Sequence, residues 1–87
     1  MSIVHQGPAD LIFYQGDHEL AVAGVHIILV ETMPQLFELM FVPDQPGSEQ
    51  AQRVQVTLPS GRVDCGTVRF SKPGWLTFVA GGEPGHE

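Results

Sequence analysis

Positive charge and cysteine are both scarce in this sequence. Only four of its 87 residues are Lys or Arg, one is Cys, and the formal net charge is −6. Residues 1–52 contain no Lys or Arg, but they contain seven acidic residues: Asp10, Asp17, Glu19, Glu31, Glu38, Asp44 and Glu49. The four cationic residues follow within a stretch of 20 residues: Arg53, Arg62, Arg69 and Lys72. The chain therefore combines an acidic first part with a short basic stretch.

The low numbers of cysteine and of cationic residues indicate in which compartment the protein acts and what it binds. A lone cysteine, Cys65, cannot form an internal disulfide, and secreted domains of this length usually depend on several. No signal-peptide pattern opens the chain, and the longest nearly uncharged apolar run, residues 20–30, is too short to span a bilayer. We therefore expect a soluble cytoplasmic protein. Four cations are too few for a conventional nucleic-acid or membrane surface, so a basic protein surface is the expected partner.

The length allows one small domain, which we place at residues 1–80, with residues 81–87 as a flexible C-terminal tail. Gly and Pro recur at short intervals, and the segments between them alternate with the period of a β-strand. Residues 11–14 and 19–23 are predicted to form a hairpin, followed by a bulge or a break at Gly24. Residues 25–30 and 36–42 are predicted to pair and to share one core face, formed by Val25, Ile27, Leu29, Phe37, Leu39 and Phe41.

A helix over residues 33–42 is the alternative to the second of these strands. Thr32 is a plausible N-cap, and Pro34 would fall in the first turn, where proline is tolerated. Such a helix would be apolar on nearly every side and would need almost complete burial. The strand is therefore our prediction, and an α+β fold with a short helix at 33–42 remains the alternative.

The second half of the chain has the clearest strand pattern. Residues 43–52 are predicted to form an exposed loop, followed by strands over 53–58, 63–70 and 75–80. Val63 and Cys65 are out of phase with Val68 and Phe70, so we expect a bulge at Gly66. These elements predict an all-β fold, a small antiparallel meander or barrel-like sandwich of about six strands. The four cations would then lie on adjoining strands or turns and form a basic patch.

The residues offer little for catalysis or metal binding. Cys65 follows Asp64, which disfavours a thiolate, and it is expected to be a partly buried small hydrophobe. Within a strand, Asp17, His18 and Glu19 would point to alternate faces and could not converge on one ion. No His or Cys spacing typical of metal sites occurs, and no glycine-rich phosphate motif. We expect no enzyme, no metal and no cofactor.

Aromatic and basic side chains mix only between Phe70 and Trp75, on either side of Lys72. An RNA-binding sheet would expose such aromatic residues beside cations. Core packing of both aromatic side chains is the expectation.

Acidic and basic residues are separated along the chain, and no set of residues typical of a catalytic site occurs. Together these features favour a non-enzymatic protein-binding module. It would present an acidic surface to a basic partner, and the residues expected to bind are acidic: Asp17, Glu19, Glu31, Glu38, Asp44 and Glu49. In overall character the chain resembles the small acidic inhibitor proteins of phages and mobile elements, including those of the anti-CRISPR type. That resemblance implies inhibition of a nucleic-acid-binding effector complex.

The alternative hypothesis is a self-associating structural or assembly subunit, such as a phage structural protein or a homodimer. In that case the basic residues of one copy, Arg53, Arg62, Arg69 and Lys72, would meet the acidic part of another.

Overall fold

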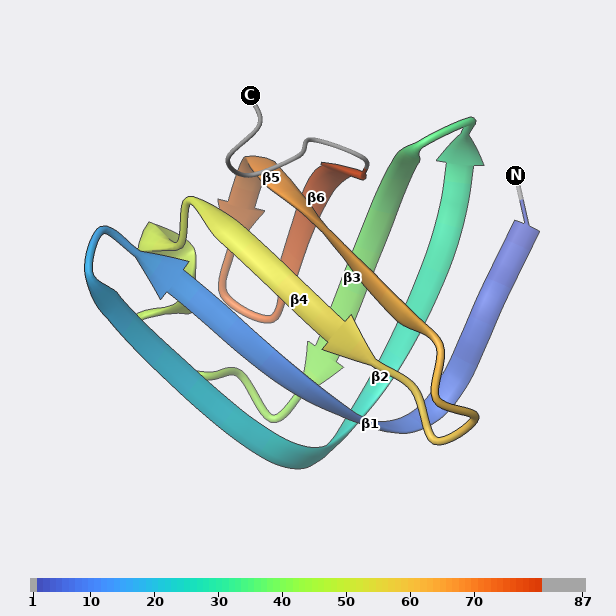
Figure 1. Cartoon of the computed structure of the whole chain (residues 1–87), viewed down its shortest axis with the longest axis horizontal. Helices are drawn as coiled ribbons and strands as arrows, with labels where there is room; N and C mark the ends of the chain where they lie inside the picture. The colour runs from blue at the N-terminus through green and yellow to red at the C-terminus, as the bar shows by residue number, and fades with distance from the viewer. Residues whose placement is uncertain (1, 81–87) are drawn as a thin grey trace.

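The computed structural model describes residues 2–80, which form a closed six-stranded antiparallel barrel (Figure 1). In chain order its elements are β1 (Ser2–Gln15), β2 (His18–Met33), β3 (Leu36–Val42), the 3-10 helix η1 (Ser48–Gln50), β4 (Arg53–Thr57), β5 (Val63–Lys72) and β6 (Trp75–Ala80). The all-β prediction is confirmed. The alternative helix over 33–42 is not found, because Pro34 and Gln35 form a turn and residues 36–42 are strand β3. The predicted tail, 81–87, lies outside the described residues.

Two meanders make up the barrel, and its strand order is β1-β2-β3-β6-β5-β4. The segment 43–52 carries the chain from the end of β3 to β4, which pairs with β1. β6 then returns beside β3 and closes the barrel. β1 and β2 are long and strongly curved (Figure 1). Within the described chain, residues 2–9 of β1 pair with β2 alone, whereas residues 11–14 pair with both β2 and β4.

The interior is filled by alternate residues of the strands. All six predicted core residues are buried: Val25, Ile27, Leu29, Phe37, Leu39 and Phe41. The remaining large members of the core come mainly from β1, β4 and β6: Leu11, Phe13, Val54, Val56, Leu58, Leu76 and Phe78. The ring of Phe37 stacks on that of Phe78, with centroids 5.2 Å apart. Because successive side chains of a strand point to opposite faces, every second residue of each strand lies in a common apolar interior.

Gly24 forms the predicted bulge between β1 and β2. The register shifts from Ala9 paired with Val25 to Leu11 paired with Val22. The backbone of Gly24 is left-handed (φ +69°), and its N–H donates to Oδ1 of Asp10 at 3.0 Å. The side chain of Asp10 thereby satisfies an amide that the bulge removes from the strand ladder.

The second predicted bulge, at Gly66, is wrong. Gly66 is buried in the barrel wall, and β5 instead gains its extra residue at Arg69, where the register shifts between Val68 and Phe70. The inserted residue reverses the phase of the rest of β5, so Phe70 points outward with 68% of its surface exposed. The prediction that Phe70 packs in the core is therefore also wrong. Trp75 is half-buried on the outside of β6.

Candidate protein-binding surface

Three of the six acidic residues predicted to bind a partner make hydrogen bonds within the chain. Oε2 of Glu38 accepts from the indole N–H of Trp75 at 2.7 Å. Oδ1 of Asp44 accepts from the N–H of Gly74 at 2.9 Å, and Oε2 of Glu31 accepts from the N–H of Gln35 at 3.4 Å. These carboxylates help to hold turns and a cross-strand contact, so they already have a structural role.

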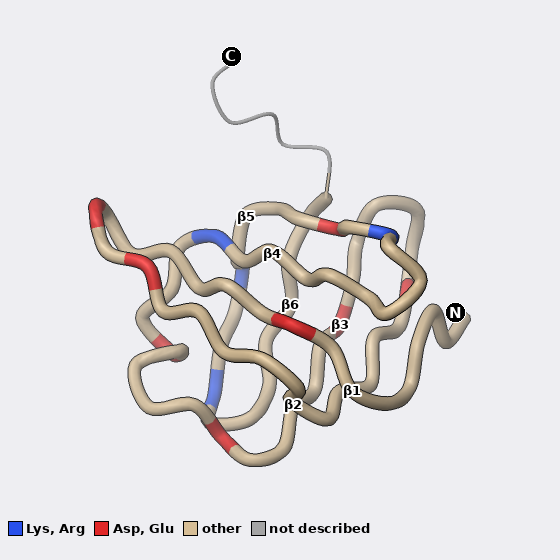
Figure 2. Tube along the Cα trace, turned by 60° about the horizontal axis from the view of Figure 1, so that its bottom comes forward, with Lys and Arg blue, Asp and Glu red and all other residues tan. Residues whose placement is uncertain are grey.

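The other three predicted acids form a separate group. Asp17 and Glu19 lie at the β1–β2 hairpin, and Glu49 lies in η1. Their carboxylates make no hydrogen bond or ion pair with another residue in the 2–80 range. Figure 2 shows the acidic positions dispersed over the trace rather than gathered in one area. The six predicted acidic positions are therefore dispersed over the described chain.

The four cations are also divided. Arg62 precedes β5 and pairs with Asp64, with Nε 2.8 Å from Oδ2. Arg53 lies at the opposite end of the β4–β5 hairpin, where its guanidinium is 5.5 Å from the ring centroid of Tyr14. The amine of Lys72 lies 5.0 Å from the centroid of Trp75. Arg53 and Arg62 thus lie at opposite ends of one hairpin, so a single four-residue patch does not form.

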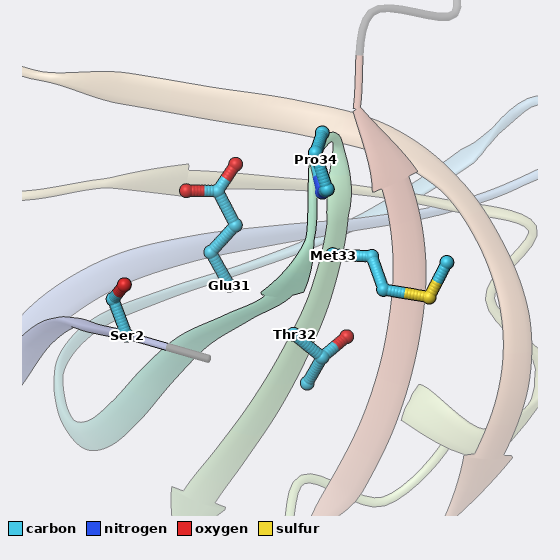
Figure 3. Close-up of a pocket in the computed structure, with 5 residues that line it drawn as sticks. All are labelled: Ser2, Glu31, Thr32, Met33 and Pro34. Carbon is cyan, nitrogen blue, oxygen red and sulfur yellow. The ribbon is translucent and has the colours of Figure 1, made fainter.

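A small surface pocket of about 190 Å³ surrounds Glu31, at the β2–β3 turn (Figure 3). It is lined by Ser2, Glu31, Thr32, Met33 and Pro34. The side chains of Ser2 and Glu31 extend to one side of β2, while that of Met33 extends to the other (Figure 3). The polar groups do not converge on a common point, so this pocket does not hold a nucleophile beside its base.

Hydroxyl groups elsewhere in the described chain bond to the backbone. Ser71 donates to the carbonyl oxygen of Glu49 at 2.6 Å, and Thr32 donates to that of Leu36 at 3.2 Å. No hydrogen bond in residues 2–80 joins a Ser, Thr or Cys side chain to a His, Asp or Glu side chain. Cys65 is a half-buried free thiol, as expected.

Metal-ligating side chains are similarly dispersed in the part of the chain that the structure describes. No three His, Cys, Asp or Glu side chains there form a group that could hold a metal ion. Nor does that part contain a helix with the length and apolar character needed to cross a membrane.

The most unusual surface of the barrel is the outward side of β2, β3, β6 and β5. Its residues form three cross-strand rows: Val30–Glu38–Thr77–Phe70, Ile28–Met40–Trp75–Lys72 and Met33–Leu36–Val79–Thr67. We call this surface the apolar face and define it by its eight apolar members: Ile28, Val30, Met33, Leu36, Met40, Phe70, Trp75 and Val79. Outward residues of a barrel wall in water are usually polar, as Arg53, Gln55 and Thr57 are on β4.

A recess of about 300 Å³ lies within the apolar face, between Leu36, Arg69, Phe70 and Thr77. The Oγ1 of Thr77 is buried and has no hydrogen-bond partner within residues 2–80. Val30 is buried although it lies outside the interior cluster. Phe70 and Met33 are exposed, whereas the other apolar residues of the face are half-buried or, in Val30, buried. Outward apolar side chains grouped in this way are typical of protein-binding sites.

The apolar face was not predicted from the sequence, although the sequence contains a signal for it. Residues 25–42 are apolar in both strand phases, with Ile28, Leu36 and Met40 opposite in phase to the core residues. A strand that is apolar in both phases must be covered on both sides or must expose one apolar side. Phe70 could not be assigned to this face without knowledge of the bulge at Arg69.

No protein-family model, curated protein or solved structure matches this chain.

Proposed function

We propose that the protein is a non-enzymatic module that binds another protein through the apolar face. One observation carries the proposal: seven of the nine residues that β2, β3 and β6 contribute to the three outward rows are apolar, whereas the outward residues of β4 are polar. Exposing such a surface to water has a cost of about 25 cal/mol for each Å² of apolar area. A partner that covers it removes this cost.

The partner has a chemistry that the charges of this region specify. Glu38 lies among the apolar residues of the face. Its carboxylate has one oxygen, Oε1, with no hydrogen-bond partner within residues 2–80. A matching surface is apolar, with a basic group opposite Glu38. Proteins that hold nucleic acid have basic surfaces, so an effector complex of the kind bound by anti-CRISPR-type inhibitors is one class of partner with this charge.

Site-specific photo-crosslinking tests the proposal. Phe70 is replaced by a photoreactive phenylalanine derivative, and Val63 is replaced in a matched control, because Val63 is 52% exposed on the same strand but away from the face. Illumination of cells that produce the chain is expected to give a discrete protein adduct from position 70 and none from position 63. Equal labelling from both positions would refute the proposal.

A further inference from the structure

The bulge in β5 lies beside the recess of the apolar face. The ladder between β5 and β6 shifts from Val68 paired with Phe78 to Phe70 paired with Thr77, and Arg69 is the extra residue between them. Bulges often lie next to functional sites, where they re-aim a side chain. This bulge turns Phe70 outward, and both Arg69 and Phe70 line the recess.

The rest of the lining is apolar. Leu36 on β3 is half-buried and Phe70 on β5 is exposed. Thr77 lies between them on β6, and its Oγ1 is buried, so this residue presents no accessible hydroxyl to the recess. The volume of about 300 Å³ is at the lower limit of ligand pockets, so the recess suits one large side chain.

Arg69 is the only charged residue of this lining. Within residues 2–80 its guanidinium makes no ion pair, hydrogen bond or cation–π contact, whereas each of the other three cations makes one: Arg62 with Asp64, Arg53 with Tyr14 and Lys72 with Trp75. A guanidinium binds a carboxylate through two parallel hydrogen bonds. The matching occupant of the recess is therefore an apolar group with a carboxylate next to it.

We propose that the recess holds one large apolar side chain of the protein partner, and that a carboxylate beside this side chain pairs with Arg69. The inference rests on the proposed function, because it names the group that the partner inserts into the same face. A side chain that fills such a recess loses its contact with water, and residues of this kind contribute most of the binding energy of an interface. The ion pair with Arg69 adds orientation.

The charges of the face also set the order of the partner's groups. Glu38 on β3 and Phe70 on β5 lie on either side of Thr77 in one cross-strand row. Two interstrand steps separate them, a distance of about 10 Å. The partner is therefore expected to carry a basic group, an apolar side chain and a carboxylate in that order, over a span of about 10 Å.

Hydrocinnamate tests the recess directly, because it joins an aromatic ring to a carboxylate through a short chain. In two-dimensional amide NMR spectra of the whole chain it is expected to shift the signals of Leu36, Arg69, Phe70 and Thr77, with a dissociation constant of about 1–10 mM. Hydrocinnamamide has the same shape without the charge and is expected to bind about threefold more weakly. Phenylpropylamine, with the opposite charge, is expected to bind more weakly again.

Two matched pairs of variants locate the binding. Arg69→Gln is expected to make hydrocinnamate and hydrocinnamamide bind equally, whereas Arg62→Gln removes a cation away from the recess and is expected to keep the preference. Thr77→Leu adds apolar volume to the recess and is expected to abolish detectable binding. Thr57→Leu, on β4, is expected to leave it unchanged. Thermal unfolding confirms that each variant is folded.

The photo-crosslinking experiment tests the same ion pair with the partner itself. Arg69→Glu, added to the position-70 variant, is expected to lower the yield of the adduct at least about threefold, because it places like charges together. Arg62→Glu is the control and is expected to leave the yield unchanged. A yield that does not respond to Arg69→Glu would overturn the pairing with a partner carboxylate.

The probes and the adduct separate the two proposals. No shift with any of the three probes, or equal binding of all three, would overturn the inference about the recess. Either result together with a discrete adduct from position 70 leaves the proposed function standing. Hydrocinnamate binding without an adduct from position 70 refutes the proposed function, and with it the partner side chain assigned to the recess.

Discussion

The indole N–H of Trp75 donates to Oε2 of Glu38 at 2.7 Å, across the β3–β6 pair that closes the barrel. The two residues are diagonal neighbours, because Trp75 pairs with Met40 and Glu38 pairs with Thr77. The amine of Lys72 lies 5.0 Å from the indole centroid. The carboxylate and the amine thus orient a large aromatic side chain in the centre of the apolar face, which prepares it for contact without a change of rotamer.

Removing this hydrogen bond is expected to destabilise the barrel. Glu38→Ala leaves the half-buried indole N–H without its acceptor and is expected to lower the free energy of unfolding by about 1–2 kcal/mol. Glu38→Gln keeps a carbonyl oxygen within reach and is expected to lose less than half as much. Urea denaturation followed by far-UV circular dichroism, at one fixed protein concentration, measures both values. Equal losses for Ala and Gln would show that the indole bond contributes nothing.

Gly66 is expected to be irreplaceable, because β5 and β6 approach closely at this residue. A Cβ on Gly66 would collide with the carbonyl oxygen of Val79 and would lie 2.6 Å from the carbonyl carbon. Both atoms are backbone and cannot rotate away. Gly66→Ala is therefore expected to cost about 3 kcal/mol or more, or to prevent folding.

The adjacent Cys65 provides the control for this prediction. Its side chain is on the outside of the barrel, so Cys65→Ala is expected to change the free energy of unfolding by less than about 1 kcal/mol. Thermal and urea unfolding of both variants make the comparison. A Gly66→Ala protein as stable as Cys65→Ala would contradict the close approach.

The strands that the sequence predicted best are those in which one phase is uniformly apolar. Val25, Ile27 and Leu29 alternate with residues of the other phase, so period two alone identified their buried face. Residues 2–10 were not predicted as strand, because Gly7 and Pro8 interrupt any regular pattern. Proline is tolerated there because this part of β1, within the described chain, pairs on one side only.

The candidate site was less predictable because it depends on contacts between distant residues. The sequence analysis singled out the acids, but the bond from Trp75 to Glu38 spans 37 residues and that from Gly74 to Asp44 spans 30. Similarly, a single inserted residue at Arg69 moved Phe70 from the core to the surface. Neither the register of a strand pair nor its bulges can be read from one strand alone.

A glycine is expected to stabilise the β2–β3 turn. Gln35 follows Pro34 and has a positive φ of 69°, a conformation that costs a residue with a Cβ about 1–2 kcal/mol. Glycine removes this strain but increases the entropy of the unfolded chain, by about 0.5–1 kcal/mol. The net gain expected for Gln35→Gly is therefore about 0.5 kcal/mol.

The backbone contacts of this turn are independent of the Gln35 side chain. Its carbonyl oxygen accepts from the N–H of Ala80 at 2.7 Å, and its N–H donates to Glu31. Gln35→Ala keeps both contacts and the strain, so it is the matched control and is expected to give no gain. The midpoint of thermal unfolding, measured for both variants, decides between them. A glycine variant less stable than the alanine variant would show that the turn is not strained.

Two phenylalanines of the second meander are expected to differ sharply in their effect on stability. Phe78 is fully buried and stacks on Phe37, so Phe78→Ala is expected to cost about 3–5 kcal/mol. Phe70 is 68% exposed, so Phe70→Ala is expected to cost less than about 1 kcal/mol. Urea denaturation at one fixed protein concentration measures the two values. If Phe70→Ala cost as much as Phe78→Ala, the side chain of Phe70 would lie inside the barrel, and the bulge at Arg69 that turns it outward would be wrong.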